Sequence, residues 1–399
     1  MMYQGPIVTP PPLSERLDNL DDMLVTESEI HKVAVKRRDA GEDIILLTVA
    51  DQEAAPAQTL AACIEAIEKD SISAQAPFRL HRAMAAISSR STGLETSESQ
   101  VLAFPSGQFA LYAALQAIAD PGSHAVMFAP YYQTYHATLR AAGTAVSIVE
   151  TRPQNDFQPE RGSMEQALRS NTCLILINTP NNPTGATYSR KTLEDIAEIC
   201  LRHNLWLVSD EVYWSLADAP ISPRALPGMA DRTVVVNSMS KSHGIPSWHI
   251  GWITGPETLI TRLKKLRAIT AGEIPTPLLK ACVAALENDY GVHEIIDRHA
   301  ARRAAVLQAL RQMGKIKLRG TAAGGYLMID IREIEPDCGA FAWKLLEAEQ
   351  VAVMPGSFFG DAAKGHLRLS LGQPKEILRE AMHRLGRFVR QYPAKQGLS

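Results

Sequence analysis

The 399-residue chain has few cysteines and almost no net charge. Its five cysteines are scattered and show no C-x-x-C spacing, which argues against a metal site or a disulfide framework. We therefore expect no bound metal and a reducing, cytoplasmic environment. The 41 basic and 43 acidic residues give a formal net charge of -2, so we expect no nucleic-acid partner.

Long hydrophobic runs are also missing. No stretch approaches the roughly 18 apolar residues of a membrane-spanning helix. The N-terminal MMYQGPIVTPPPLSERLDNLDD is proline-rich, then charged, and lacks the apolar core of a signal peptide. We expect an arm without a targeting role, no membrane association and a small-molecule substrate.

From about residue 55, helical periodicity alternates with short apolar runs. The expected helices cover residues 55–70, 107–120, 132–143 and 193–204, and the expected strands 100–105, 124–130, 145–150, 173–180, 205–212, 233–240 and 249–255. Strands that alternate with helices predict an α/β fold, with a doubly wound, mostly parallel sheet covered on both faces.

After a helical stretch from about Ile260 to Ala301, the pattern changes to a smaller α+β arrangement. It has expected strands at 316–320, 324–331, 351–356 and 366–372, a helix at 340–350 and a terminal helix. A boundary near residues 290–305 is expected. We predict an N-terminal arm and small-domain segment at 1–50, a large domain at 51–295 and a small C-terminal domain at 296–399.

Ligands of doubly wound sheets bind beyond the carboxyl ends of the strands, so polar residues there are candidate site residues. LILINTPNNPTG carries Asn182, although N-P and T-G alone make a turn. LWLVSDEVYWSL places Asp210 at a strand end with Tyr213 three residues on, although a lone acid is often a helix N-cap. VVVNSMSKSHG places Lys241 after Ser238, although such a lysine is usually a solvated surface residue.

The three segments together favour pyridoxal-phosphate chemistry. This chemistry needs a lysine for a Schiff base, an acid that keeps the pyridine nitrogen protonated, donors to the ring oxygen and small donors around the phosphate. Lys241, Asp210, Tyr213 and the serines are residues of these types.

The succession N-N-P-T-G, S-D-E-V-Y, S-x-S-K followed by G-W, and R-L-S resembles the class I and II aminotransferases of fold type I, over roughly residues 30–390. SPRALPGMADRTVVVNSMSKSH with NLWLVSDEVY is most similar to bacterial arginine:pyruvate transaminases. The resemblance implies a pyridoxal 5'-phosphate enzyme that moves the α-amino group of an amino acid, with arginine or another basic one as a candidate, to a 2-oxo acid. It also implies a homodimer with shared active sites.

The resemblance assigns a role to each residue of the motifs. Lys241 would form the Schiff base and carry the proton between substrate and cofactor. Asp210 would pair with the pyridinium nitrogen. Asn182 and Tyr213 would hydrogen-bond the phenolic oxygen of the ring, with Asn182 also beside the substrate, and Tyr132 would stack on the ring face.

Phosphate and carboxylate sites are implied in the same way. The backbone N–H groups of Gly107 and Gln108, at a helix N-terminus, would bind the phosphate, together with the hydroxyls of Ser106 and Ser238. Arg368 would bind the α-carboxylate of the substrate with its forked guanidinium. The alternative for Arg368 is an exposed arginine at a strand end.

The sequence departs from the family pattern around the cofactor phosphate. His249 stands where the family has a phosphate-binding arginine, Ala74 lies near the expected place of a tyrosine from the partner subunit, and Val49 to Ala55 replace a glycine-containing entrance loop. One interpretation is compensation by neighbouring residues: Arg79, His81 or Arg82. The other is a diverted reaction such as elimination, cyclisation or oxidation.

Asp51 or Glu53 in the altered loop could face the distal cation of an arginine-like substrate, or the loop could be acidic and solvated. A function of another class is a non-catalytic ligand-sensing domain, of the kind joined to DNA-binding modules. It ranks last, because we expect no room for a helix-turn-helix domain before the arm ends.

Overall fold

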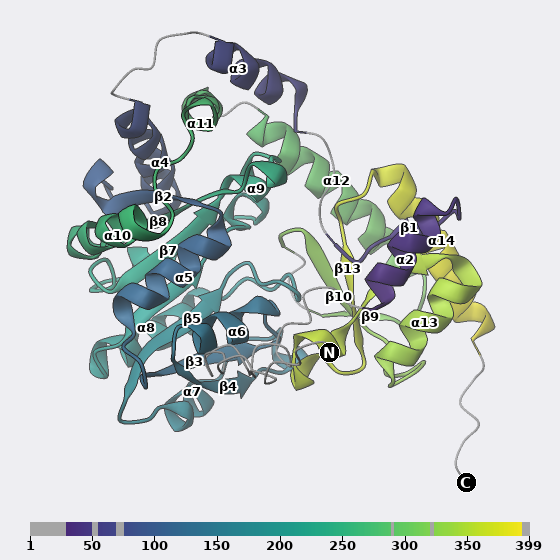
Figure 1. The fold of residues 1–399 in the computed structure, drawn as a ribbon. Coiled ribbons are helices and arrows are strands. Elements are labelled where there is room, and N and C mark those ends of the chain that lie inside the picture. The colour runs from purple at the N-terminus through teal and green to yellow at the C-terminus, as the bar shows by residue number, and fades with distance from the viewer. Residues whose placement is uncertain (1–28, 50–54, 69–75, 289–290, 320–322, 393–399) are drawn as a thin grey trace, which may run out of the picture.

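The computed structural model describes residues 29–49, 55–68, 76–288, 291–319 and 323–392. Its centre is a seven-stranded sheet (Figure 1). The spatial order of the strands is β2 (Val101–Pro105), β8 (Ile250–Thr254), β7 (Thr233–Ser238), β6 (Trp206–Asp210), β5 (Thr172–Asn178), β3 (His124–Ala129) and β4 (Ala145–Glu150). Neighbouring strands from β7 to β4 are parallel, whereas β8 runs antiparallel to both of its neighbours.

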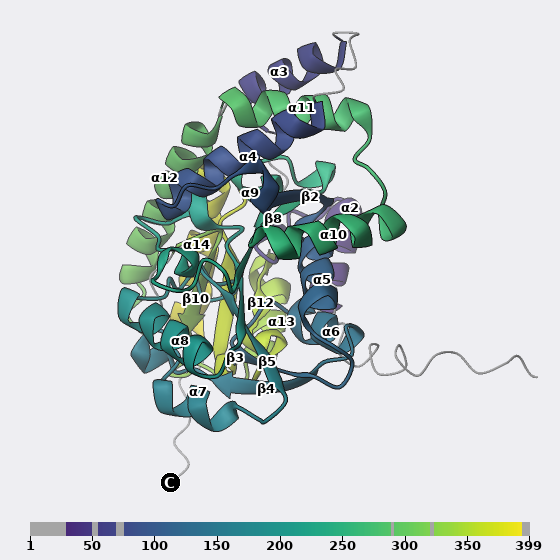
Figure 2. The same cartoon turned by 90° about the vertical axis from the view of Figure 1, so that its left-hand side faces the viewer.

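Helices cover both faces of this sheet (Figure 2). Alternate residues of a strand point to opposite faces, and those of β3 divide accordingly. Ala125 and Met127 belong to the core beneath α5 (Gly107–Ile118), α6 (Thr134–Ala141) and α10 (Glu257–Thr270), whereas Val126 and Phe128 pack towards α7 (Arg161–Ala167) and α8 (Arg190–Arg202). The predicted α/β fold is confirmed.

A second hydrophobic core lies around a four-stranded antiparallel sheet. The sheet has the order β12 (Met354–Pro355), β13 (His366–Ser370), β10 (Tyr326–Asp330) and β9 (Lys317–Arg319). Against it lie α2 (Glu29–Asp39), α12 (Val292–Arg311), α13 (Cys338–Glu349) and α14 (Lys375–Gln391), while β1 (Ile45–Leu46) pairs with β11 (Val351–Ala352). This second core is formed by residues before position 50 and after position 295, which supports the predicted domain limits. The limits themselves stay a prediction.

A third core joins three helices beyond the edge of the large sheet: α3 (Ala57–Glu68), α4 (Ala76–Thr92) and α11 (Thr276–Asn288). Helix α4 was not among the predicted helices, although its buried Leu80, Met84 and Ser88 recur at helical spacing. The long helical stretch predicted from Ile260 is three helices, α10, α11 and α12.

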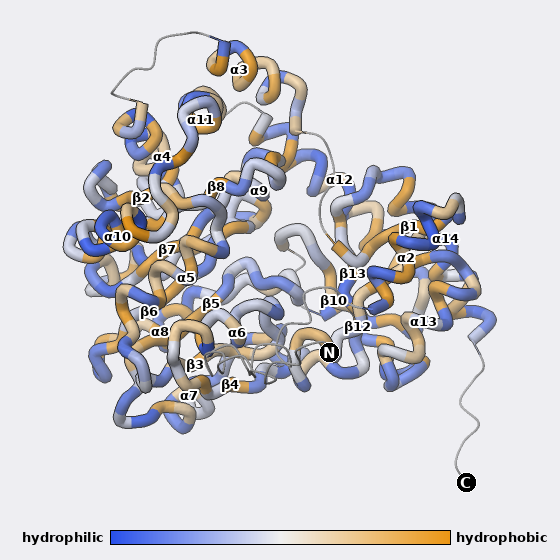
Figure 3. Tube along the Cα trace, in the orientation of Figure 1, coloured by the Kyte–Doolittle hydropathy of each residue, from blue (hydrophilic) through white to orange (hydrophobic). Residues whose placement is uncertain are grey.

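Hydropathy follows this layering. Figure 3 shows hydrophobic stretches along α5 and β7 at the centre and hydrophilic stretches around α14 at the outside. Among the described residues, no helix is long and apolar enough to cross a membrane, and no cluster of metal-ligating side chains occurs.

Candidate active site

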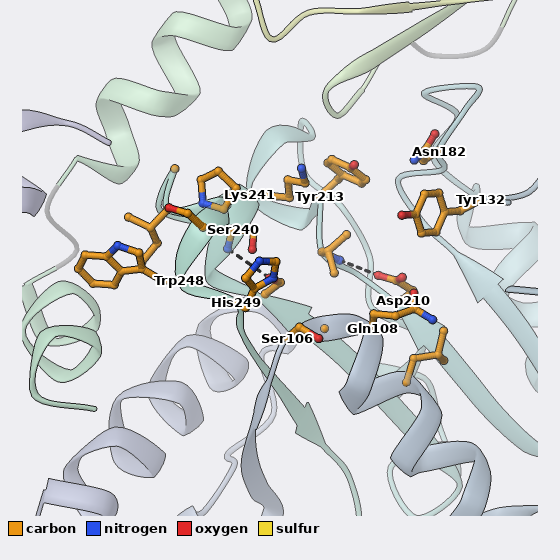
Figure 4. Close-up of a pocket in the computed structure, with 18 of the residues that line it drawn as sticks. Ser106, Gln108, Tyr132, Asn182, Asp210, Tyr213, Ser240, Lys241, Trp248 and His249 are labelled. Carbon is orange, nitrogen blue, oxygen red and sulfur yellow. Dashed lines mark hydrogen bonds between the residues drawn. The ribbon is translucent and has the colours of Figure 1, made fainter. Parts of the chain in front are cut away.

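A cavity of about 990 Å³ lies at the carboxyl ends of β5, β6 and β7, where α5 begins. This is the edge at which parallel sheets bind ligands. Ten residues that the sequence predicted for the cofactor site line it together (Figure 4): Ser106, Gly107, Gln108, Tyr132, Asn182, Asp210, Tyr213, Ser238, Lys241 and His249. They come from segments far apart in the chain.

Lys241 lies in the one-turn helix α9 (Met239–Ser242), directly after β7. Ser238 begins this turn: its Oγ accepts a hydrogen bond from the N–H of Ser240 at 3.2 Å and donates one to the carbonyl of Ile250 at 3.1 Å. The turn is thereby linked to β8, and the half-buried lysine side chain points towards Tyr213 (Figure 4).

Asp210 ends β6 and is 7% exposed. Its Oδ1 accepts the N–H of Val212 at 3.1 Å, and its Oδ2 accepts the hydroxyl of Tyr135 at 2.5 Å. Burial raises the pKa of Asp210 to about 6, although both hydrogen bonds lower it. Because a buried carboxylate with neutral partners is costly, a cationic ring nitrogen in the cavity would stabilise it.

Asn182 connects the cavity to Arg368. The N–H of Asn182 donates to Oδ1 of Asn178 at 2.7 Å, and its own Oδ1 accepts Nη1 of Arg368 at 3.0 Å. Arg368 also donates to the carbonyl of Thr48, and its guanidinium lies between the rings of Tyr326 and Phe359. Arg368 is only 4% exposed, so the interpretation as an exposed strand-end arginine is wrong.

The N-terminus of α5 forms another wall of the cavity. Ser106 caps the helix at a φ of 85°, and its Oγ accepts the N–H of Phe109 at 3.1 Å. The side-chain amide of Gln108 donates to the hydroxyl of Thr138 at 2.7 Å and accepts that of Thr134 at 2.9 Å, which fixes its orientation. Backbone N–H groups at a helix start bind anions well.

Gly251 permits this helix start to lie against β8. A side-chain carbon at Gly251 would come within 2.5 Å of the backbone nitrogen of Gly107 and 2.6 Å of its Cα. No residue larger than glycine fits there without moving α5. The close approach therefore sets the position of the start of α5.

His249 lies at the rim of the cavity, where its side chain is exposed and its φ is 51°. The three residues expected to compensate for it do not line the cavity of their own chain. Arg79 pairs with Glu287 and Arg82 with Glu98, whereas burial lowers the pKa of His81 to about 4. Ala74, Asp51 and Glu53 lie outside the described residues, but Ala55 lines the cavity.

The donor set fits pyridoxal phosphate. A lysine amine and a carboxylate that accepts hydrogen bonds from two neutral donors share one cavity, and the start of α5 with its neighbouring serines offers donors to a phosphate. These groups could hold the aldehyde carbon, the ring nitrogen and the phosphate respectively.

Five further residues line the cavity: Asn178 and Ser240, which lie within the predicted motifs but received no role, and Tyr135, Trp248 and Tyr326, which were not predicted as site residues. Tyr135 follows Tyr132 at helical spacing, a signal that could have identified it. Tyr326 had no such signal, because it lies on β10 of the other sheet.

The sequence of this chain is similar to those of known aminotransferases. A family model described as aminotransferase class I and II matches residues 49–385. Arginine–pyruvate transaminase AruH of Pseudomonas aeruginosa is 34% identical over 364 residues, covering 90% of this chain and 93% of the relative. Aspartate/prephenate aminotransferase of Thermus thermophilus is 31% identical over 371 residues, covering 90% and 94%.

Solved structures show the same similarity. The aspartate aminotransferase from Thermus thermophilus with maleate superposes with a TM-score of 0.85 at 30% identity, covering 94% of this chain and 99% of that one. The aromatic aminotransferase from Pyrococcus horikoshii gives a TM-score of 0.82 at 27% identity, covering 90% and 99%.

Proposed function

Because this chain belongs to the class I and II aminotransferase family, we propose that the residues lining its cavity, together with Arg368 next to the lining residue Asn182, carry the roles that the motifs imply. The chain is a pyridoxal-phosphate enzyme that transfers amino groups to 2-oxo acids. The observation that carries the residue assignment is the convergence of Lys241, Asp210 and the start of α5 on one cavity.

Bound pyridoxal phosphate supplies an aldehyde that condenses with amines and a protonated ring that withdraws electrons. Lys241 takes the proton from the Cα of the substrate and later returns one. Asp210 holds the proton on the ring nitrogen. Tyr213 and Asn182 donate to the phenolic oxygen, and Tyr132 covers one face of the ring.

The α-carboxylate of the substrate binds Arg368 in this proposal. A guanidinium offers two parallel donors to a carboxylate. The rings of Tyr326 and Phe359, with centroids 4.2 and 4.6 Å from the guanidinium carbon, hold its plane in place. Asn182 is bonded to Arg368 at 3.0 Å and therefore lies between the carboxylate site and the ring site.

The phosphate binds at the start of α5. The N–H groups of Gly107 and Gln108 and the hydroxyls of Ser106 and Ser238 are its donors, with His249 at the rim. Serine hydroxyls and backbone groups bind the oxygens but do not balance the charge of about -1.5 to -2. A ring N–H of His249 is a further donor to the phosphate.

A basic amino acid, arginine in particular, is the proposed amino donor. The similarity to arginine–pyruvate transaminase AruH supports this, and Asp51 and Glu53 precede the cavity residue Ala55 in the chain. Arginine and norleucine should then differ in kcat/KM by a factor equivalent to about 1 to 3 kcal/mol. Equal values for the two amino acids would refute this substrate assignment.

We also propose that the enzyme is a homodimer with shared active sites and that it is located in the cytoplasm. The exposed apolar side chains Ile64, Ile67 and Phe78 support an interface, because they flank residues 69–75, which contain the expected partner contribution. The free thiols of the cysteines fit a reducing compartment.

Light scattering tests the dimer. The native mass should be twice 43.6 kDa, and Phe78→Asp should lower it, whereas Ile377→Asp on α14 should not. A monomeric, fully active native enzyme would contradict the proposal.

The function itself is tested by a spectral titration of the purified holoenzyme with each of the twenty amino acids. The absorbance of the lysine-bound cofactor should convert to that of its amine form with the true donors, and a 2-oxo acid should reverse the change. If no amino acid converts the spectrum, the residue assignment fails.

A further inference from the structure

Tyr326 belongs to the small sheet but reaches the cavity of the large one. It is the first residue of β10, is 7% exposed, and lines the cavity with Tyr213. Tyr213 follows β6 of the large sheet and is 5% exposed. The two side chains form one small buried cluster with Leu216 and Ile295, so a contact between the two sheets lies directly at the site.

The contact with Tyr213 is polar as well as aromatic. The ring centroids are 6.0 Å apart, with the planes at 78°, and a hydrogen bond links the two side chains. The backbone fixes this arrangement. The N–H of Gly324 donates to the carbonyl of Leu216 at 3.2 Å, and a side-chain carbon at Gly324 would lie 3.4 Å from the Cβ of Tyr213.

Tyr326 also contacts Arg368. The strand register pairs Tyr326 with Ser370 and Met328 with Arg368, so Tyr326 and Arg368 are diagonal neighbours on one face of the sheet. The guanidinium carbon lies 4.2 Å from the ring centroid of Tyr326, a cation–π distance. One side chain thus contacts the proposed carboxylate site through its ring and Tyr213 through its hydroxyl.

We propose that Tyr326 is a positioning residue that couples carboxylate binding at Arg368 to the hydrogen bond that Tyr213 donates to the cofactor. The coupling rests on the proposed function, which assigns those roles to Arg368 and Tyr213. The hydrogen bond raises the pKa of Tyr213, so the hydroxyl of Tyr213 donates it here. When Tyr213 donates instead to the phenolic oxygen of the cofactor, its own oxygen can accept the hydroxyl of Tyr326. Hydrogen bonds in such a chain strengthen one another.

A substrate carboxylate attracts the guanidinium of Arg368 and thereby shifts the ring of Tyr326, which packs against it. The hydroxyl of that ring then changes how strongly Tyr213 stabilises the anionic phenolic oxygen. Other titratable groups face the pair from neighbouring elements: Tyr132 before α6, Asp210 on β6, Lys241 on α9 and Arg368 on β13. They stay unchanged when only Tyr326 is replaced, so their effects cancel in the comparison.

The first test measures the pH at which the spectrum of the bound cofactor changes in the holoenzyme. Tyr326→Phe keeps the ring and removes the hydroxyl, so the midpoint should rise by about 0.3 to 1 pH unit, because the phenolic oxygen is less stabilised. Tyr112→Phe removes a hydroxyl on α5 outside the cavity and should leave the midpoint unchanged.

The second test uses butyrate, an unreactive carboxylate, as the probe of Arg368. Saturating butyrate should move the midpoint of the native holoenzyme, and Tyr326→Phe should lose at least half of that movement. Phe359→Leu removes the other ring and should weaken butyrate binding roughly threefold to tenfold but keep the movement at saturation. Tyr326→Leu should weaken binding and abolish the movement.

A Tyr326→Phe enzyme with the native midpoint and the native response to butyrate would overturn the coupling, since the hydroxyl of Tyr326 would then have no effect on Tyr213. Butyrate binding should be lost in Arg368→Gln, and unchanged binding in that variant would be a separate failure. That result would overturn the carboxylate role of Arg368, on which the coupling rests.

Discussion

The hydroxyl of Tyr135 donates a hydrogen bond of 2.5 Å to Oδ2 of Asp210 at the buried end of β6. Tyr135 is 4% exposed and Asp210 7%, so the bond lies in a medium that screens it weakly. This neutral donor orients the carboxylate and favours its ionised form, which is the form that a protonated ring nitrogen needs. Asp210 therefore depends on a residue outside the sequence motif that contains it.

Tyr135→Phe should weaken cofactor binding. A hydrogen bond to a charged group contributes about 1.5 to 3 kcal/mol, so the dissociation constant of pyridoxal phosphate should rise by about tenfold to a hundredfold. The comparison is with Tyr188→Phe, which removes the hydroxyl of another buried tyrosine outside the cavity. Equal constants for the two variants would contradict the role of Tyr135.

Asp210→Asn should stabilise the apoenzyme at pH 8. Burial raises the pKa of Asp210 from 3.8 to about 6, so ionising it costs the folded state up to about 3 kcal/mol, at 1.36 kcal/mol per unit. The folded pKa is the higher one, so this cost is absent below pH 3.8, grows as the pH rises and is complete above pH 6.

Urea unfolding of both apoproteins from pH 4.5 to 8 measures this difference. The free energy of unfolding of Asp210→Asn, relative to that of the native apoprotein, should increase from pH 4.5 to 8. The variant should also bind the cofactor more weakly than the native protein does. A difference in stability that does not vary with pH would show that Asp210 is not a strained buried carboxylate.

Gly251→Ala should displace the start of α5. The added carbon would lie within 2.7 Å of three backbone atoms of Ser106 and Gly107, and backbone cannot yield as a flexible side chain does. We expect the affinity for pyridoxal phosphate to fall at least tenfold, an effect of about 1.4 kcal/mol or more. Gly255→Ala is the control. Gly255 directly follows β8, and a side-chain carbon there would lie 3.5 Å or more from its neighbours, which is ordinary van der Waals contact.

His249→Arg should tighten cofactor binding. An arginine carries a permanent charge and offers a forked donor to a phosphate. The dissociation constant of pyridoxal phosphate should therefore be lower for the variant than for the native enzyme. Equal constants would show that the side chain at position 249 does not contribute to phosphate binding.

Much of the fold followed from the sequence, because strands and helices of the large sheet alternate clearly. The direction of β8 could not be predicted, since the alternation in HIGWITG is the same whichever way the strand runs. The contribution of Ile45 and Leu46 to the second core also depends on a pairing with Val351 and Ala352 that local periodicity does not encode.

The site could be predicted where its residues end predicted strands, as Asp210 does, or follow one directly, as Lys241 does. Strand ends of a parallel sheet meet at one edge whatever their distance in sequence. Tyr326 was missed because its place depends on how the small sheet packs against the large one. Arg368 was proposed as a site residue through its family motif, and its burial against the rings of Tyr326 and Phe359 had no sequence signal.

Lys241→Ala tests the central assignment most directly. Borohydride reduction of the native holoenzyme, followed by peptide mass spectrometry, should find the cofactor attached to Lys241. Lys241→Ala should lose both this adduct and the absorbance near ~400 nm of a cofactor Schiff base, whereas Lys191→Ala, an exposed lysine on α8, should keep both. A reducible adduct that persists in Lys241→Ala would contradict the account.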